Sequence, residues 1–106
     1  MNFGLSKETL NQIREIVKEN PKYKFKIFGS RAKNTYKKNS DIDIAVFENV
    51  SKEDEYKIRN SFDLLNIVYK IDLVFINPDT KLEFLNEIKK EGVEIKWSVL
   101  KKEKKI

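Results

Sequence analysis

Apolar residues recur along this chain with two different periods, and the period predicts where helices and strands lie. The first set at helical spacing comprises four residues, Leu10, Ile13, Ile16 and Val17. Ser6 stands before this set as an N-cap, and Asn20 before Pro21 ends it, because a residue that precedes proline is pushed out of the helical region. The pattern therefore predicts a first helix over residues 7–19.

Four shorter segments are rich in β-branched and aromatic residues and predict strands. They are residues 23–28, 41–47, 71–76 and 93–97. The first two become apolar on both faces, as strands of a covered sheet do, whereas the last alternates cleanly, as an edge strand with one solvated face does. Residues 67–69 fit either the end of the preceding helix or the start of the third strand.

Capping residues between these strands predict where the other helices begin. Residues 31–33 fit a short helical turn, which Asn34 can leave in the left-handed conformation. Ser51, with Asp54 three residues later, resembles a capping box and opens a helix over residues 52–65.

A last helix is predicted between the third and fourth strands. Thr80 and Glu83 form a second capping-box pattern, and Gly92 fits the left-handed residue just beyond the helix. Its apolar face comprises Leu82, Leu85 and Ile88. The order of elements predicts an α/β fold, an α+β sandwich in which helices pack on a mixed sheet of about four strands.

Composition adds limits to this picture. A chain of 106 residues is expected to form one domain, and it contains neither cysteine nor histidine. Disulfides, the usual zinc sites and Ser-His or Cys-His catalysis are therefore excluded. No apolar run is long enough to cross a bilayer and no signal peptide is visible, so we expect a cytoplasmic protein.

The net charge of +5 is local. Four lysines lie in residues 101–106, a tail that we expect to be frayed, and four further basic residues lie in residues 31–38. The rest of the chain is slightly acidic, so a general nucleic-acid-binding surface is not indicated.

The candidate chemistry is concentrated near the ends of the predicted strands. Gly29 and Ser30 follow the first strand, where a backbone without Cβ and a hydroxyl can approach phosphate oxygens. Asp41 and Asp43 open the second strand with side chains on one face, and Asp72 interrupts the apolar third strand. Three carboxylates converging from two strands can hold two Mg²⁺ ions about 3.5–4 Å apart, as a two-metal phosphoryl-transfer site requires.

Each of these residues also has a purely structural interpretation. Asp41 and Asp43 fit a solvated loop end, and Ser30 fits a turn. Asp72 would be costly to bury alone, so an ion pair with a lysine or arginine is the alternative to a metal.

The order of these residues resembles a known superfamily. Gly29-Ser30, ten further residues, Asp41-x-Asp43 and a later strand acid, Asp72, are similar to the motif of nucleotidyltransferases related to DNA polymerase β.

Within that superfamily, the short length and the string Gly-Ser-Arg-Ala over residues 29–32 resemble the minimal nucleotidyltransferase (MNT) family. The resemblance covers nearly the whole chain, with residues 1–100 as the single domain and 101–106 as its basic tail. One departure is visible, since the family commonly has a basic residue and then glycine where this chain has Lys33 and Asn34.

The resemblance implies roles for the candidate residues. Gly29 and Ser30 would hold the triphosphate of ATP. Asp41 and Asp43 would bind both metal ions, and Asp72 would complete the site and help to activate the acceptor hydroxyl. Two basic residues, Arg31 and Lys33, are candidates for further contacts with the triphosphate, whereas Lys37 and Lys38 fit solvated loop charges.

The resemblance also implies a partner. Members of the MNT family resembling this chain are antitoxins paired with a HEPN-domain ribonuclease toxin, and several silence it by transferring AMP from ATP to a tyrosine. We therefore expect a Mg²⁺-dependent protein adenylyltransferase that forms a hetero-oligomer with its toxin. The alternative is an antitoxin that neutralises its partner by binding alone, while a small-molecule or nucleic-acid substrate is disfavoured by the chain's length and charge distribution.

Overall fold

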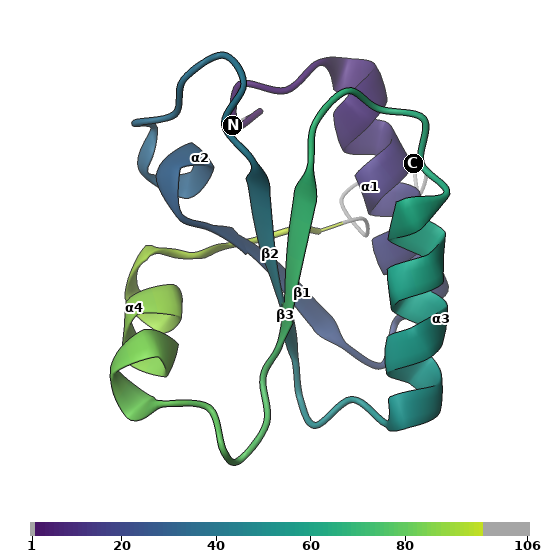
Figure 1. Ribbon diagram of the computed structural model, residues 1–106, viewed down its shortest axis with the longest axis vertical. Helices are drawn as coiled ribbons and strands as arrows, with labels where there is room; N and C mark the ends of the chain where they lie inside the picture. The colour runs from purple at the N-terminus through teal and green to yellow at the C-terminus, as the bar shows by residue number, and fades with distance from the viewer. Residues whose placement is uncertain (1, 97–106) are drawn as a thin grey trace, which may run out of the picture.

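The computed structural model of the protein describes residues 2–96. Its elements, in chain order, are α1 (Lys7–Glu19), β1 (Lys24–Phe28), α2 (Ser30–Lys33), β2 (Ile42–Phe47), α3 (Lys52–Asp63), β3 (Ile71–Phe75), α4 (Leu82–Glu91) and β4 (Val93–Glu94) (Figure 1). Every predicted helix and strand is present. The predicted strand at 93–97 is shorter than expected within the described residues, and Trp97 and the tail 101–106 lie outside them.

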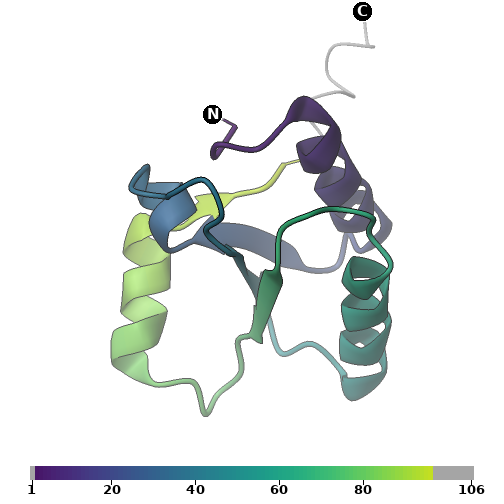
Figure 2. The ribbon, with the colours of Figure 1, turned by 45° about the horizontal axis from the view of Figure 1, so that its top comes forward.

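The four strands form one mixed sheet in the order β3-β2-β1-β4. β1 pairs antiparallel with both β2 and β4, whereas β2 and β3 run parallel. The carboxyl end of β1 therefore lies beside the first residues of β2 and β3, along the edge of the sheet that crosses the strand ends. Figure 2 turns this edge toward the viewer. The predicted fold class, an α/β sandwich with a mixed four-stranded sheet, is confirmed.

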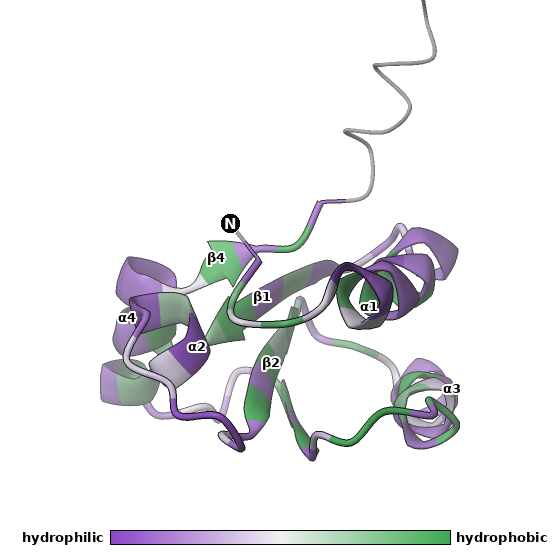
Figure 3. Cartoon of the chain, turned by 90° about the horizontal axis from the view of Figure 1, so that it is seen from above, coloured by the Kyte–Doolittle hydropathy of each residue, from purple (hydrophilic) through white to green (hydrophobic). Residues whose placement is uncertain are grey.

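Helices cover both faces of the sheet (Figure 1). α1 and α3 pack on one face and enclose the larger core, which includes Leu10, Ile13, Phe25, Ile27, Ile42, Ile44, Ile58 and Phe62. α4 packs on the other face over a smaller cluster of Ala45, Phe47, Ile76 and Ile88. Figure 3 shows mainly hydrophilic residues along the outer surfaces of the helices, while the apolar residues of the two clusters lie between helices and sheet.

The serine caps predicted from the sequence are confirmed. The Ser6 hydroxyl accepts a hydrogen bond from the Thr9 backbone N–H at 3.1 Å, and Ser51 accepts one from Asp54 N–H at 3.1 Å. Asn20 ends α1 in a non-helical conformation (φ −127°, ψ 60°). Short polar side chains at these positions satisfy backbone donors that the first turn leaves unpaired.

Two predictions about α4 are wrong. The Thr80 hydroxyl accepts from Asn77 N–H at 3.0 Å, so it closes the preceding turn and the N-cap moves to Lys81, without a side-chain cap. Gly92 is extended (φ −71°, ψ 149°) because the chain passes directly into β4. A Cβ there would lie 2.5 Å from the Ile88 carbonyl oxygen, so glycine is required for a close backbone approach and not for a left-handed turn.

Residues 67–69 belong to neither of the two predicted alternatives. They lie in the loop between α3 and β3, which is irregular over residues 65–70. None of the helices in residues 2–96 is both long and apolar enough to cross a membrane.

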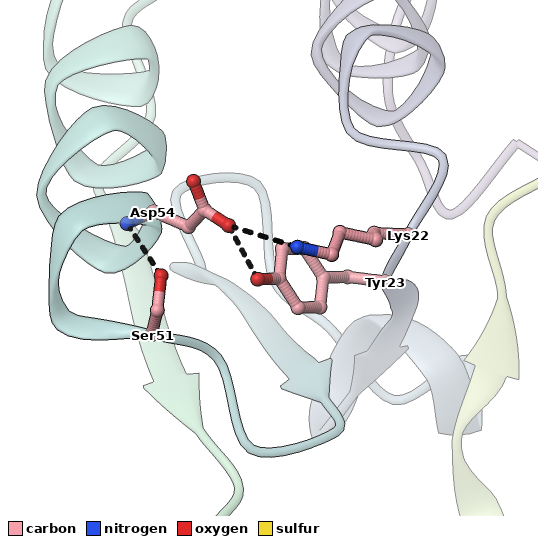
Figure 4. Close-up of polar contacts among 4 residues, drawn as sticks. All are labelled: Lys22, Tyr23, Ser51 and Asp54. Atoms are coloured by element: carbon pink, nitrogen blue, oxygen red, sulfur yellow. Dashed lines mark hydrogen bonds and ion pairs between the residues drawn. The ribbon is translucent and has the colours of Figure 1, made fainter.

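A polar contact ties the start of β1 to the start of α3 (Figure 4). The Tyr23 hydroxyl donates to the Asp54 carboxylate, and the Lys22 ammonium lies 3.9 Å from the same oxygen. The Tyr23 hydrogen bond is the main cause that lowers the pKa of Asp54; burial opposes it, and the Lys22 charge adds a smaller lowering effect.

Tyr23→Phe is expected to lower the melting temperature at pH 7. An acid whose pKa is lowered by folding stabilises the native state above its unfolded pKa of about 3.9, and that contribution is lost as the pH falls through the folded pKa. Thermal unfolding followed by circular dichroism should therefore show the difference from wild type shrinking below about pH 4. Lys22→Met is the control with a smaller effect, since Lys22 is 76% exposed. A Tyr23→Phe difference that does not change with pH would contradict this account.

Candidate functional site

Three aspartates meet at the edge of the sheet where β2 and β3 begin. Asp41 immediately precedes β2, Asp43 is its second residue, and Asp72 is the second residue of β3. Asp43 and Asp72 are direct partners in the parallel register. Because Ile42 and Ile44 point into the core under α1 and α3, Asp43 lies on the opposite face of the sheet, the face that α4 covers.

The charges of these aspartates act on one another. The pKa of Asp43 is raised, first by burial, then by the negative charge of Asp72 and then by that of Asp41. Among residues 2–96, however, no three acidic side chains stand close enough together to form a ready-made metal cluster. The backbone thus brings the carboxylates to one place, and rotation of the side chains is needed to aim them at one ion.

Asp72 is more exposed than the sequence predicted. β3 is an edge strand, and the Asp72 side chain is 42% exposed although its neighbours in the strand are apolar. Its carboxylate lies 3.7 Å from the Lys70 ammonium, the ion pair that was the structural alternative to a metal. Such an exposed pair contributes little to stability, so Asp72 remains available for a ligand.

Gly29 is held in a conformation that suits glycine alone. Its φ of 74° and ψ of −154° turn the chain sharply from β1 into α2, and a Cβ at this position would lie 2.5 Å from the Asp43 carboxylate oxygen Oδ2. Ser30 is the first residue of α2. The turn at Gly29 therefore lies directly against the Asp43 carboxylate.

The end of α2 confirms the expectation for Asn34. It adopts the left-handed conformation (φ 64°, ψ 29°), so asparagine makes the turn for which the family commonly has glycine. Lys33, the basic residue before it, lies 3.8 Å from Glu91 and forms an ion pair with α4.

Arg31 is buried, and its guanidinium is occupied by contacts within the chain. Only 1% of the residue is exposed. Nη1 donates to the Phe3 carbonyl at 2.9 Å, and Nη2 and Nε donate to the Ser40 carbonyl at 2.9 and 3.2 Å. The structure therefore does not present Arg31 to a ligand in the way that the sequence led us to expect. The aromatic partners of Arg31, Tyr36 and Tyr69, were missed, and no periodicity or motif in the sequence marks them.

A hollow of about 570 Å³ opens beside the acidic cluster. It is lined by Lys38, Asn39, Asp41, Val68, Tyr69 and Lys70. Val68 is 93% exposed and adds an apolar side chain to the rim. Two lysines beside an aspartate give the hollow both a positive and a negative wall.

The donor set fits a hard divalent cation. Asp41, Asp43 and Asp72 supply only carboxylate oxygens, the ligands that Mg²⁺ prefers. Burial is the main cause of the raised Asp43 pKa, and the negative charges of Asp72 and Asp41 add to it; a bound cation would relieve this repulsion between the carboxylates.

The fold and this edge of the sheet define a nucleotidyltransferase domain. The family model described as polymerase beta, nucleotidyltransferase, matches residues 11–98, and the chain belongs to that family. The superfamily resemblance seen in the sequence is thereby confirmed. No curated protein sequence matches this chain.

Several solved structures with similar folds are toxin–antitoxin complexes. A toxin–antitoxin crystal structure with AMP-PNP shares 24% identity and a TM-score of 0.59, over 82% of this chain and 72% of that one. The MntA-HepT toxin–antitoxin shares 20% identity and a TM-score of 0.57, over 92% and 78%. A complex of MNT antitoxin with the tri-AMPylated HEPN toxin of Shewanella oneidensis shares 19% identity and a TM-score of 0.58, over 93% and 78%. These similarities show that this chain shares the fold of those structures.

Proposed function

We propose that this chain is the antitoxin of a HEPN ribonuclease toxin and transfers AMP from ATP to a tyrosine hydroxyl of that toxin. The observation that carries the proposal is the register that sets Asp43 opposite Asp72, with Asp41 two residues earlier and Gly29 against the Asp43 carboxylate. The nucleotidyltransferase family and the toxin–antitoxin complexes among the similar structures support it.

Asp41, Asp43 and Asp72 would hold two Mg²⁺ ions. When bound, these ions supply charge that neutralises phosphate oxygens and stabilises the attacking and leaving oxygens. The Gly29-Ser30 turn would bind the triphosphate, because it offers an N–H without a neighbouring side chain and a hydroxyl beside the acids.

In the proposed reaction, the tyrosine oxygen forms a bond to the α-phosphorus of ATP while the bond from that phosphorus to the bridging oxygen breaks. Pyrophosphate leaves with that oxygen. Asp72 is the most suitable of the three carboxylates to take the hydroxyl proton, since its side chain is 42% exposed at the open edge of the sheet. The hollow lined by Asp41 and Val68 gives the acceptor a route to this edge.

The test uses a candidate HEPN partner, Mg²⁺ and ATP labelled at the α-phosphate. We expect label to appear on the HEPN protein, and the site to be a tyrosine when the product is digested and sequenced by mass spectrometry. Asp41→Asn should remove the label. No label with the wild-type chain, or equal labelling by the variant, would count against transfer by this site.

A second function, neutralisation of the toxin by binding alone, is favoured by the contacts of the site residues. Arg31 is enclosed, Lys33 is paired with Glu91, and the three acids do not stand as a formed cluster. The double variant Asp43→Asn, Asp72→Asn distinguishes the two functions in a toxicity assay. Protection equal to wild type would show that binding suffices, whereas loss of protection by a variant that still binds the toxin would show that transfer is needed.

A further inference from the structure

Arg31 lies where four separate segments of the chain come together. It belongs to α2, its guanidinium donates to Phe3 of the N-terminal segment and to Ser40 of the connector, and it packs against rings from the connector and the α3–β3 loop. The guanidinium carbon lies 5.1 Å from the centre of the Tyr36 ring and 4.7 Å from that of Tyr69. No ion pair involving Arg31 is present among residues 2–96, so carbonyl oxygens and aromatic faces compensate the buried charge.

Two of these contacts are adjacent in sequence to the acidic cluster. Ser40, whose carbonyl accepts two Arg31 hydrogen bonds, directly precedes Asp41. Tyr69 stands three residues before Asp72. The two strand beginnings are joined to each other as well, because the Ile42 N–H donates to the Lys70 carbonyl at 2.9 Å.

We propose that Arg31 is a positioning residue for the nucleotidyltransferase site, which fixes the beginnings of β2 and β3 so that Asp41 and Asp72 face Asp43. It does so from α2, the helix that also begins with the Gly29-Ser30 turn, and thereby couples the phosphate-binding turn to the metal-binding acids. Arg31 makes no contact with the triphosphate. This inference rests on the proposed function, and it replaces the triphosphate contact expected from the sequence.

The chemistry of the position requires arginine. Three nitrogens of one planar group reach two carbonyls, and the same group lies over two aromatic rings. Lysine keeps the charge, but its single ammonium cannot reproduce this fork or stack in the same way. Arg31→Lys therefore keeps the charge but removes the forked hydrogen bonds and the stacking on the rings.

The test compares Arg31→Lys with wild type by hydrogen exchange and by Mg²⁺ binding. Exchange of the Ile42 amide, which pairs with Lys70 beside the site, should accelerate. The Ile76 amide, which donates to Val46 at 2.9 Å at the far end of the same two strands, should keep its protection. The Mg²⁺ concentration for half-maximal thermal stabilisation should rise by roughly 10–100-fold, the usual effect of losing a residue that orients a metal ligand.

The control is Arg59→Lys. Arg59 also stacks on a ring, that of Phe75 at 4.8 Å, and also pairs with a neighbour, Glu55 at 3.2 Å, but it is 50% exposed on α3. This variant should leave the Ile42 amide and Mg²⁺ binding unchanged.

Two results would overturn the proposal. Equal acceleration at Ile42 and Ile76 would mean a general loss of stability, and an increase in the KM for ATP with unchanged exchange and unchanged Mg²⁺ binding would mean direct contact with the triphosphate. The exchange and Mg²⁺ measurements need no transfer activity. A failure of the adenylylation assay with wild type therefore bears on the proposed function and leaves this test of Arg31 intact.

Discussion

Asp43→Asn is expected to abolish AMP transfer and, in the same protein, to stabilise the metal-free fold. The lost carboxylate is the central one of the three, opposite Asp72 in the register and two residues from Asp41. A metal ion contributes several kcal/mol of charge stabilisation to such a reaction, so losing its ligand should lower the rate by at least about a thousandfold.

The gain in stability follows from the direction of the pKa shift. Burial and then the charges of Asp72 and Asp41 raise the pKa of Asp43 in the folded chain. The folded state therefore holds that proton more tightly than the unfolded state, and its stability falls as the pH rises from about 4 through the raised pKa. Asparagine removes this cost at neutral pH. After allowance for solvent screening at this partly exposed group, a few tenths of a kcal/mol should raise the melting temperature by roughly 1–3 °C.

Thermal unfolding with and without Mg²⁺ checks both effects. Mg²⁺ should raise the melting temperature of the wild-type chain and leave that of Asp43→Asn unchanged, because a ligand stabilises only the state that binds it. Asp79→Asn, a change of the same type in the exposed turn before α4, should behave as wild type. If Asp43→Asn were less stable than the wild-type chain in the absence of metal, the result would contradict the conclusion that the ionised Asp43 carboxylate destabilises the metal-free fold.

Gly29→Ala is expected to lower both the stability of the fold and the rate of transfer. The conformation of Gly29 lies in a region that other residues scarcely populate and that costs of order 1–3 kcal/mol. The new Cβ would also stand 2.5 Å from Asp43 Oδ2 and displace that carboxylate. Transfer should therefore fall by at least about tenfold, with a further loss of stability of the same 1–3 kcal/mol.

Asn34→Ala separates the two causes. Asn34 also has a positive φ, of 64°, and lies at the other end of α2, so alanine there adds backbone strain without meeting the Asp43 carboxylate. Denaturant unfolding should show both variants destabilised, whereas the transfer rate per folded molecule should fall for Gly29→Ala alone. Equal rates for the two variants would show that the close approach of Gly29 to Asp43 has no part in the chemistry.

Local rules in the sequence predicted much of this fold. Ser6 and Ser51 cap helices because each hydroxyl accepts a hydrogen bond from a backbone N–H that the first turn of the helix leaves unpaired. Thr80 had the same capping-box pattern, but its hydroxyl accepts from the Asn77 N–H in the preceding turn. The pattern alone could not show which N–H would donate to it. Asn34 left α2 as expected, whereas Gly92 had two possible reasons to be glycine and the sequence favoured the wrong one.

The sequence predicted which residues belong to the candidate site, but not how exposed or buried each of them is. The spacing of Asp41 and Asp43 and the presence of Asp72 in a strand were enough to expect their convergence, and the parallel register sets Asp43 opposite Asp72. The exposure of Asp72 depends on β3 being the edge strand, and the burial of Arg31 depends on Tyr36 and Tyr69 from distant segments. Strand order and contacts between distant residues are properties of the whole fold, so no local pattern reports them.

The central claim is that the three aspartates at this edge of the sheet transfer AMP to a protein hydroxyl. The most direct measurement is the reaction of the wild-type chain, Mg²⁺ and a HEPN partner with ATP labelled at either the α- or the γ-phosphate. We expect label on the partner from α-labelled ATP only, dependent on Mg²⁺ and lost in Asp43→Asn. Label from γ-labelled ATP would indicate phosphate transfer, and no label from either, together with full protection against the toxin by Asp43→Asn, would contradict the account.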